Sequence, residues 1–316
     1  MDAVRRKHLL RIAGWVAATV VVIYVARSLA EGLRQLATQP MPSRPGWGNI
    51  AASGVLFLCA HAVLVQTWRS VLSCWDQRLP FWGAARIWSV SNLGKYVPGK
   101  VWQIGAMSAM SRGLGVSPIA ASAAAILGAI VNVIAGFVIS LACGRVLLEK
   151  THPGWSSAAT LIVSVSLTGL LLAPVLVPRL APVLARLVGR RLDTTLPVRA
   201  VVYSLIGNVI AWLIYGAAFQ LLMIGLLGSA TGDYAAYLAA YTISYLGGYL
   251  AFFAPAGVGV REYLMGRVIE AAMLGTAPQA ALIMIVSRVW LTLLEVTPAF
   301  IFWTHHRLQP SPTTID

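Results

Sequence analysis

One interruption in an otherwise apolar chain reads Gly94-Lys95-Tyr96-Val97-Pro98-Gly99-Lys100-Val101-Trp102. Proline removes a backbone donor and glycine permits a tight bend, so Val97-Pro98-Gly99 predicts a turn between two helical segments. A charge inside a membrane costs about 2.5–3.5 kcal/mol on insertion scales, so lysines at such a turn call for a functional explanation.

The composition around this turn is that of a membrane protein. Of 316 residues, 58% are apolar and 11% are charged, and the mean hydropathy is +0.77. Soluble domains carry about 25% charged residues. The net charge of +14 indicates cytoplasmic loops and anionic lipid headgroups. Nucleic acid is not expected as a partner, because the basic residues form no long cluster and no known binding motif.

Seven stretches are long enough to cross a hydrocarbon core about 30 Å thick, which takes about 20 residues. They run near 9–29, 49–69, 117–147, 157–177, 200–227, 234–254 and 280–303. Two further stretches, near 84–110 and 256–275, are helical in composition but are broken by proline and glycine or carry charge.

Lysine and arginine predict the orientation, because they are enriched in cytoplasmic loops. Basic residues at 5–11 place the N-terminus in the cytoplasm, and the arginines of 179–199 place that loop there too. The connection 228–233 has no lysine or arginine and is expected outside. With these points fixed, residues 87–112 must enter and leave on one side, as a re-entrant hairpin. Non-helical backbone at membrane depth implies a cavity beside it.

A second interruption resembles the first. It reads Phe252-Phe253-Ala254-Pro255-Ala256-Gly257-Val258-Gly259-Val260-Arg261-Glu262, and Pro255 follows Pro98 by 157 positions, almost half the chain. The alternative is that both breaks are ordinary kinks in membrane helices. A repeat predicts one transmembrane domain, 1–316, with halves of about 1–157 and 158–316.

An odd number of spans in each half would make the halves inverted, with the second hairpin entering from outside and the C-terminus cytoplasmic. We therefore expect an all-α integral membrane protein: a polytopic helix bundle of two inverted halves, with about six full spans plus two opposed re-entrant helical hairpins. Whether residues 234–254 cross fully or form half of a hairpin stays open.

Charged residues near the breaks are the candidates for binding a phosphate headgroup. Arg261 and Lys100 are the first choices, by bidentate and point-charge contact respectively, and Glu262 and Glu295 would hold the guanidinium groups. The candidate substrate-binding residues are Lys95, Tyr96, Pro98, Gly99, Lys100, Trp102, Gln103, Arg112, Pro255, Gly257, Gly259, Arg261, Glu262, Arg288 and Glu295.

Structural roles are the alternative. Lys95, Arg112 and Arg267 would extend to the interface, and Arg288 and Glu295, seven positions apart on one helical face, would form an ion pair. Polar residues within the spans are expected to join helices by hydrogen bonds; they are His61, Gln66, Asn132, Asn208 and Gln220.

Catalytic machinery is not visible in the sequence. There is no phosphate-binding Walker loop, no HExxH and no cysteine or histidine pattern with metal spacing. We therefore expect no catalytic residue, no metal and no cofactor.

The two interruptions resemble the paired signatures of the flippase-like membrane domain of lysylphosphatidylglycerol synthetases. The motifs are Gly94–Trp102, followed by Arg112, and Pro255–Glu262. Two departures stand out: Ala256 replaces the first glycine of the family's Pro-Gly-Gly, and Trp102-Gln103 stands where the family often has Gly-Glu. The resemblance implies a stand-alone member, with two opposed re-entrant elements and lipid transfer between leaflets, but without the aminoacyl-transfer domain.

The expected function is that of a lipid transporter in the cell (inner) membrane, a flippase moving an anionic phospholipid or a polyprenyl-phosphate-linked lipid. Three alternatives remain at this stage: a membrane enzyme acting on lipid-linked substrates, a non-catalytic partner of a lipid-modifying enzyme or glycosyltransferase, and a transporter of small anions. Small residues in several spans allow close packing within one subunit or between subunits, so a homo-oligomer is also open.

Overall fold

The computed structural model describes Arg34 and residues 45–96, 102–151, 154–188, 195–251 and 254–308. Every regular element in these ranges is helical, as the sequence predicts. The elements are α2 (Trp47–Ser73), α3 (Phe81–Asn92), η1 (Leu93–Tyr96), α4 (Trp102–Arg112), α5 (Pro118–Thr151), α6 (Trp155–Val188), α7 (Val198–Leu227), α8 (Tyr234–Leu250), η2 (Pro255–Gly257), α9 (Val260–Ala271) and α10 (Ala277–Leu308), where η marks a short 3-10 helix. The predicted span 9–29 and the predicted turn at 97–99 lie outside the described residues.

In the part of the chain that the structure describes, five helices are long and apolar enough to cross a membrane. The crossing stretches are Trp47–Ser73 in α2, Pro118–Glu149 in α5, Trp155–Arg179 in α6, Val198–Leu227 in α7 and Ala277–Phe302 in α10. Each contains or closely overlaps a span predicted from the sequence. The chain is a polytopic helical membrane protein.

The predicted stretch 234–254 forms helix α8, which has 17 residues and a length of about 26 Å. That length is at the lower limit of the roughly 17–25 residues of a membrane span. The helix ends at Leu250, and α9 packs back against it. Helices α8 and α9 are therefore the two arms of a helical hairpin.

The first hairpin is formed by α3 and α4, which contact each other and are joined through η1. Its first arm begins at Phe81, a few residues before the predicted start at 87. Each hairpin lies in sequence between two long apolar helices: α2 and α5 flank the first, and α7 and α10 flank the second. The repeat itself stays a prediction, because its first span, 9–29, lies outside the described residues.

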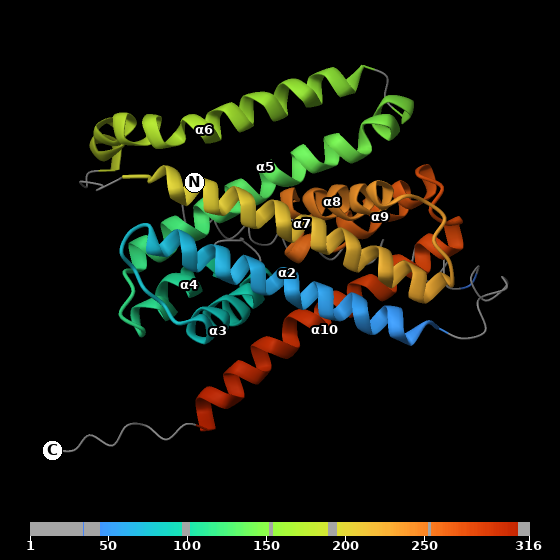
Figure 1. The fold of residues 1–316 in the computed structure, drawn as a ribbon, viewed down its shortest axis with the longest axis horizontal. Helices are drawn as coiled ribbons and strands as arrows, with labels where there is room; N and C mark the ends of the chain where they lie inside the picture. Colours follow the sequence, from blue (N-terminus) through green and yellow to red (C-terminus); the bar gives the residue numbers. More distant parts are fainter. Residues whose placement is uncertain are drawn as a thin grey trace, which may run out of the picture.

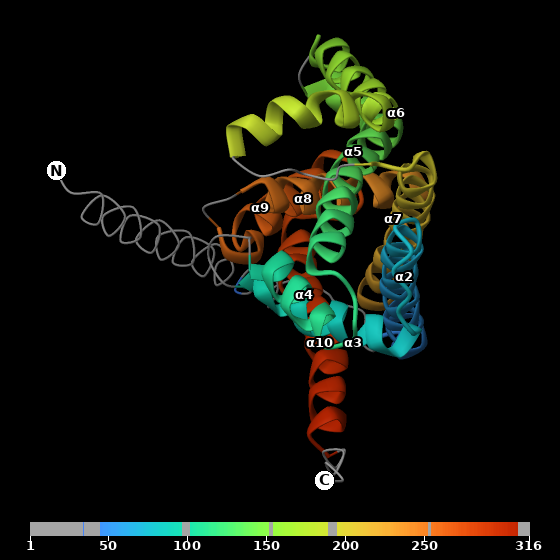
Figure 2. The same cartoon turned by 90° about the vertical axis from the view of Figure 1, so that its left-hand side faces the viewer.

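The long helices enclose the hairpins unequally. Helix α2 lies along α7, and α5 packs on both α7 and α8. Helix α6 lies at the outer edge beside α5 in both views (Figures 1 and 2), and only 6% of its most apolar window is buried. The C-terminal part of α10 projects from the bundle (Figure 2). The core therefore lies among α2, α5, α7, α10 and the two hairpins.

Candidate functional site

A cavity of about 190 Å³ lies inside the bundle. Since one water needs roughly 10–15 Å³ by this measure, it has room for on the order of ten waters. Its wall is formed by residues of α2, α3, η1, α4, α5, α7, α8, η2, α9 and α10. The tips of the two hairpins, η1 and η2, contact each other. The described parts of both interruptions therefore meet at this one cavity.

The turn of the second hairpin has a backbone that positions the start of α9. Ala256, Gly257 and Gly259 all have positive φ angles, of 48°, 69° and 90°. A Cβ on Gly257 would lie 2.6 Å from the Cα of Gly248 in α8, so only glycine allows this approach. The Glu262 carboxylate accepts a hydrogen bond of 2.7 Å from the Gly259 N–H and caps α9. Arg261 is thereby held in the first turn of α9.

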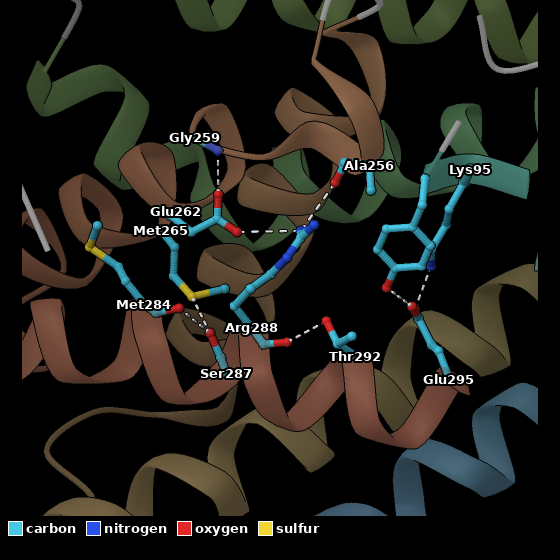
Figure 3. A network of polar contacts seen from close by, with 11 residues as sticks. Lys95, Ala256, Gly259, Glu262, Met265, Met284, Ser287, Arg288, Thr292 and Glu295 are labelled. Carbon is cyan, nitrogen blue, oxygen red and sulfur yellow. Dashed lines mark hydrogen bonds and ion pairs between the residues drawn. The ribbon is translucent and has the colours of Figure 1, made fainter. Parts of the chain in front are cut away.

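An ion pair joins the first hairpin to α10. Lys95 Nζ lies 2.5 Å from Glu295 Oε1 (Figure 3). The Tyr96 hydroxyl donates a hydrogen bond of 2.8 Å to Glu295 Oε2. The Lys95 side chain is 24% exposed. The alternative prediction that Lys95 extends to the interface therefore does not describe its contact in this structure.

A second ion pair joins the second hairpin to the same helix. Arg288 Nη1 lies 3.4 Å from Glu262 Oε1 and donates a hydrogen bond of 3.1 Å to the Ala256 carbonyl. Arg288 and Glu295 lie two turns apart on α10, and each pairs with a different hairpin (Figure 3). The pair between these two residues that the sequence allowed does not form, whereas Glu262 does hold a guanidinium group as predicted.

Arg261 is held differently from these charges. Its guanidinium carbon lies 5.3 Å from the ring centres of both Tyr241 and Tyr245. The residue is only 8% exposed, and its Nη2 has no hydrogen-bond partner. It makes no ion pair with any residue that the structure describes. The ring faces attract a cation but carry no charge to neutralise it.

The aromatic surface under Arg261 was missed in the sequence. Tyr241 stacks on Tyr245 at 6.3 Å between ring centres, and Tyr245 stacks on Tyr249 at 6.2 Å. Trp212 and Tyr215 of α7 pack against the same rings. Tyrosines at every fourth position of residues 237–249 place the rings on one helical face, and this spacing was the available signal.

Several polar residues of the spans hold helices together. The Asn132 side chain in α5 donates a hydrogen bond of 2.9 Å to Asn208 in α7, and Trp212 donates one of 3.1 Å to the Asn132 carbonyl. These contacts are of the predicted kind. His61 and Trp68 of α2 also line the cavity, and their ring nitrogens Nε2 and Nε1 are buried without a partner. The wall thus has hydrogen-bonding capacity that the protein itself does not use.

The wall of the cavity is charged in one part and apolar in another. Its charged residues come from η1, α9 and α10. Helices α2, α4 and α5 contribute a largely apolar part, which includes Leu64, Val71, Ile104, Met107, Ala124, Ala125 and Gly128. The surface offered to a ligand is therefore amphipathic.

Seven of the predicted site residues line the cavity, namely Lys95, Tyr96, Gln103, Gly257, Arg261, Arg288 and Glu295. Gly259 and Glu262 are buried beside it and support the wall. Trp102 is 56% exposed and Arg112 is exposed, and neither belongs to the wall. Pro98, Gly99 and Lys100 lie outside the described residues. Pro255 begins η2, and its side chain is not among those that the structure describes.

Within the described ranges, no three histidine, cysteine, aspartate or glutamate side chains gather as a metal site would require. The described cysteines are Cys59, Cys74 and Cys143, and all are free thiols. The wall of the cavity offers a ligand charge pairing, hydrogen bonding and aromatic contact.

No family model and no curated protein matches the chain. The resemblance to the flippase-like domain therefore stays a prediction that rests on the two motifs.

Proposed function

We propose that this protein transports an anionic lipid between the leaflets of a membrane, with the phosphate of the headgroup bound by Arg261. The observation that carries the proposal is the state of Arg261: buried, stacked on Tyr241 and Tyr245, unpaired, and in the wall of a cavity inside a membrane bundle. An ionisable residue in such a place marks a ligand or ion pathway by default. A phosphate oxygen is a fitting partner for a guanidinium.

The amphipathic wall favours a lipid over a soluble anion. A free anion needs only the charged part, formed by Lys95, Arg261, Arg288 and Glu295. The apolar part formed by α2, α4 and α5 would accept the beginning of an acyl or prenyl chain. Because burial of each methylene contributes about 0.8 kcal/mol, such contact supports lipid binding.

The two ion pairs suggest how access to the cavity changes. Each ties one hairpin tip to α10, through Lys95 with Glu295 and through Glu262 with Arg288. A bound phosphate would compete with the carboxylates for these cations and loosen one tip. The hairpins would then act as gates on the two sides of the cavity, as interrupted helices do in inverted-repeat transporters.

A transfer assay in liposomes tests the proposal. The full chain is reconstituted with fluorescent phosphatidylglycerol or fluorescent phosphatidylcholine. A quencher is added outside the liposomes, and the rate at which inner-leaflet lipid becomes accessible to it is measured. We expect the wild-type protein to transfer phosphatidylglycerol faster than phosphatidylcholine. Arg261→Gln should reduce that rate by roughly tenfold or more, because it removes the only unpaired cation of the described wall.

Arg267→Gln is the matched control. Arg267 lies on the same helix α9, but it is exposed, and among the described residues its ion-pair partner is Glu270 at 3.8 Å. Its loss should leave transfer unchanged. Undiminished phosphatidylglycerol transfer by a folded Arg261→Gln protein, or no transfer by the folded wild type, would contradict the proposal.

A further inference from the structure

The charges around the cavity pair off and leave one cation over. Among the described residues, Lys95 is compensated by Glu295, and Arg288 is compensated by Glu262. Arg261 has no carboxylate within ion-pair distance among the described residues and lies against the faces of two tyrosine rings. The described site without ligand therefore carries one uncompensated positive charge.

A charge buried away from water is costly unless it is paired and hydrogen-bonded. Aromatic faces lower that cost for Arg261 but do not cancel its charge. A ligand that brings one negative charge neutralises the site. A ligand with two negative charges leaves one of its own unpaired, or must draw Lys95 or Arg288 away from its carboxylate. Glu295 is 9% exposed and Glu262 5% exposed, so either carboxylate would then be left buried without its partner.

We propose that the cavity selects a lipid whose headgroup has a single negative charge, which is the charge of a phosphodiester, over a phosphomonoester or diphosphate. This inference rests on the proposed function and narrows its substrate class. The cavity would accept a phospholipid whose headgroup alcohol is uncharged, or a prenyl lipid whose phosphodiester carries a neutral group. Polyprenyl monophosphate and diphosphate are disfavoured.

Equilibrium binding of two lipids tests the charge rule. The purified full chain in detergent is titrated at pH 8 with phosphatidylglycerol and with phosphatidic acid, and the bound lipid is counted by native mass spectrometry. The second ionisation of a phosphomonoester lies near pH ~6, so phosphatidic acid carries close to two charges at pH 8, and phosphatidylglycerol carries one. The wild type should bind phosphatidylglycerol at least roughly tenfold more tightly than phosphatidic acid.

Charge variants separate this rule from headgroup size. Glu295→Gln releases Lys95 and raises the charge of the site by one, so the preference should move toward phosphatidic acid by roughly tenfold or more. Lys95→Gln together with Glu295→Gln removes one charge of each sign and should restore the wild-type preference. If Glu295→Gln does not fold, Glu262→Gln replaces it. This variant releases Arg288 and should shift the preference toward phosphatidic acid in the same way. Arg267→Gln should leave the preference unchanged.

Two outcomes would overturn the inference. One is wild-type binding of phosphatidic acid as tightly as phosphatidylglycerol. The other is the same lipid preference in the folded single and double variants. A separate result would contradict the proposed function: no Arg261-dependent binding of phosphatidylglycerol together with no transfer of this lipid in liposomes. Arg261-dependent binding without the charge preference would leave transport standing and reject only the single-charge rule.

Discussion

A guanidinium stacked on two tyrosine rings keeps its charge available to a ligand, because ring faces attract a cation without neutralising it. Arg261 differs in this respect from Lys95, which pairs with Glu295 of α10. It also differs from Arg288 of α10, which pairs with a carboxylate of α9. The paired residues tie the hairpins to α10, and under the proposed function the unpaired one contacts the ligand. Three cations that look alike in the sequence therefore have two different kinds of contact.

Ala256 offers a test of the second hairpin turn at the level of a single residue. Its φ of 48° is left-handed, which costs a residue with a Cβ about 1–2 kcal/mol. Glycine avoids that cost and loses roughly 0.5–1 kcal/mol in chain entropy. Ala256→Gly should therefore stabilise the fold by up to about 1 kcal/mol, seen as a higher unfolding midpoint in detergent.

The control for this change is Ala158→Gly. Ala158 is an exposed helical residue of α6, and it is not among the described residues with positive φ. Glycine there should lower stability by about 1 kcal/mol. A lower midpoint for both variants would show that the turn of the isolated protein is not strained at Ala256.

At this scale the sequence identified the charges but not their partners. Helical spacing correctly places Arg288 and Glu295 on one face of α10, yet spacing within a helix does not tell which neighbouring elements that face meets. The contact of Lys95 with Glu295 joins residues 200 positions apart, and only the packing of the whole chain brings them together. The tyrosines of α8 were readable from their spacing, but a row of aromatic residues in an apolar helix more often indicates packing than a site.

At the level of elements, length and helix breakers were the reliable signals. The long apolar stretches after residue 45 were predicted as helices because about 20 apolar residues suffice to cross a membrane. The stretch 234–254 was ambiguous because apolar character runs on past Leu250, where α8 ends. Hydropathy does not report the backbone turn that ends the helix. The contacts of α9 with α8, which hydropathy does not contain, show that the chain folds back after Leu250.

The pairing of α2 with α7 can be tested through one small residue. A Cβ on Gly207 of α7 would lie 2.7 Å from Thr67 Cγ2 of α2, far inside van der Waals contact. Gly207→Val should therefore force these helices apart and destabilise the protein by about 2 kcal/mol or more. Thermal unfolding in detergent measures the loss.

Gly169 of α6 provides the matched control, because nothing lies within 4 Å of the position of its Cβ. Gly169→Val is expected to leave the unfolding midpoint unchanged or slightly raised, since valine has the higher helix propensity. Equal effects of the two substitutions would mean that close approach at Gly207 is not what holds α2 against α7.

At the level of the whole molecule, the predicted orientation places the two ends of α7 on opposite sides of the membrane. Thr195 precedes this helix and Ser229 follows it, and both are exposed. In a cysteine-free background, Ser229→Cys should react with an impermeant maleimide in intact cells. Thr195→Cys should react only after the cells are permeabilised.

Labelling of the two positions with the sides exchanged would reverse the predicted topology. Labelling of both from outside would mean that α7 does not cross. Either result would also remove the charge distribution of the loops as a guide for this protein.

The contact between Lys95 and Glu295 also sets an order of events during biosynthesis. A ribosome that adds about 5–20 residues per second takes roughly 10–40 s to make the 200 positions between them. During that interval the lysine of the first hairpin has been made, and its carboxylate has not. The last helix therefore completes the first hairpin, and a nascent chain truncated before α10 would carry an uncompensated cation that membrane quality control could recognise.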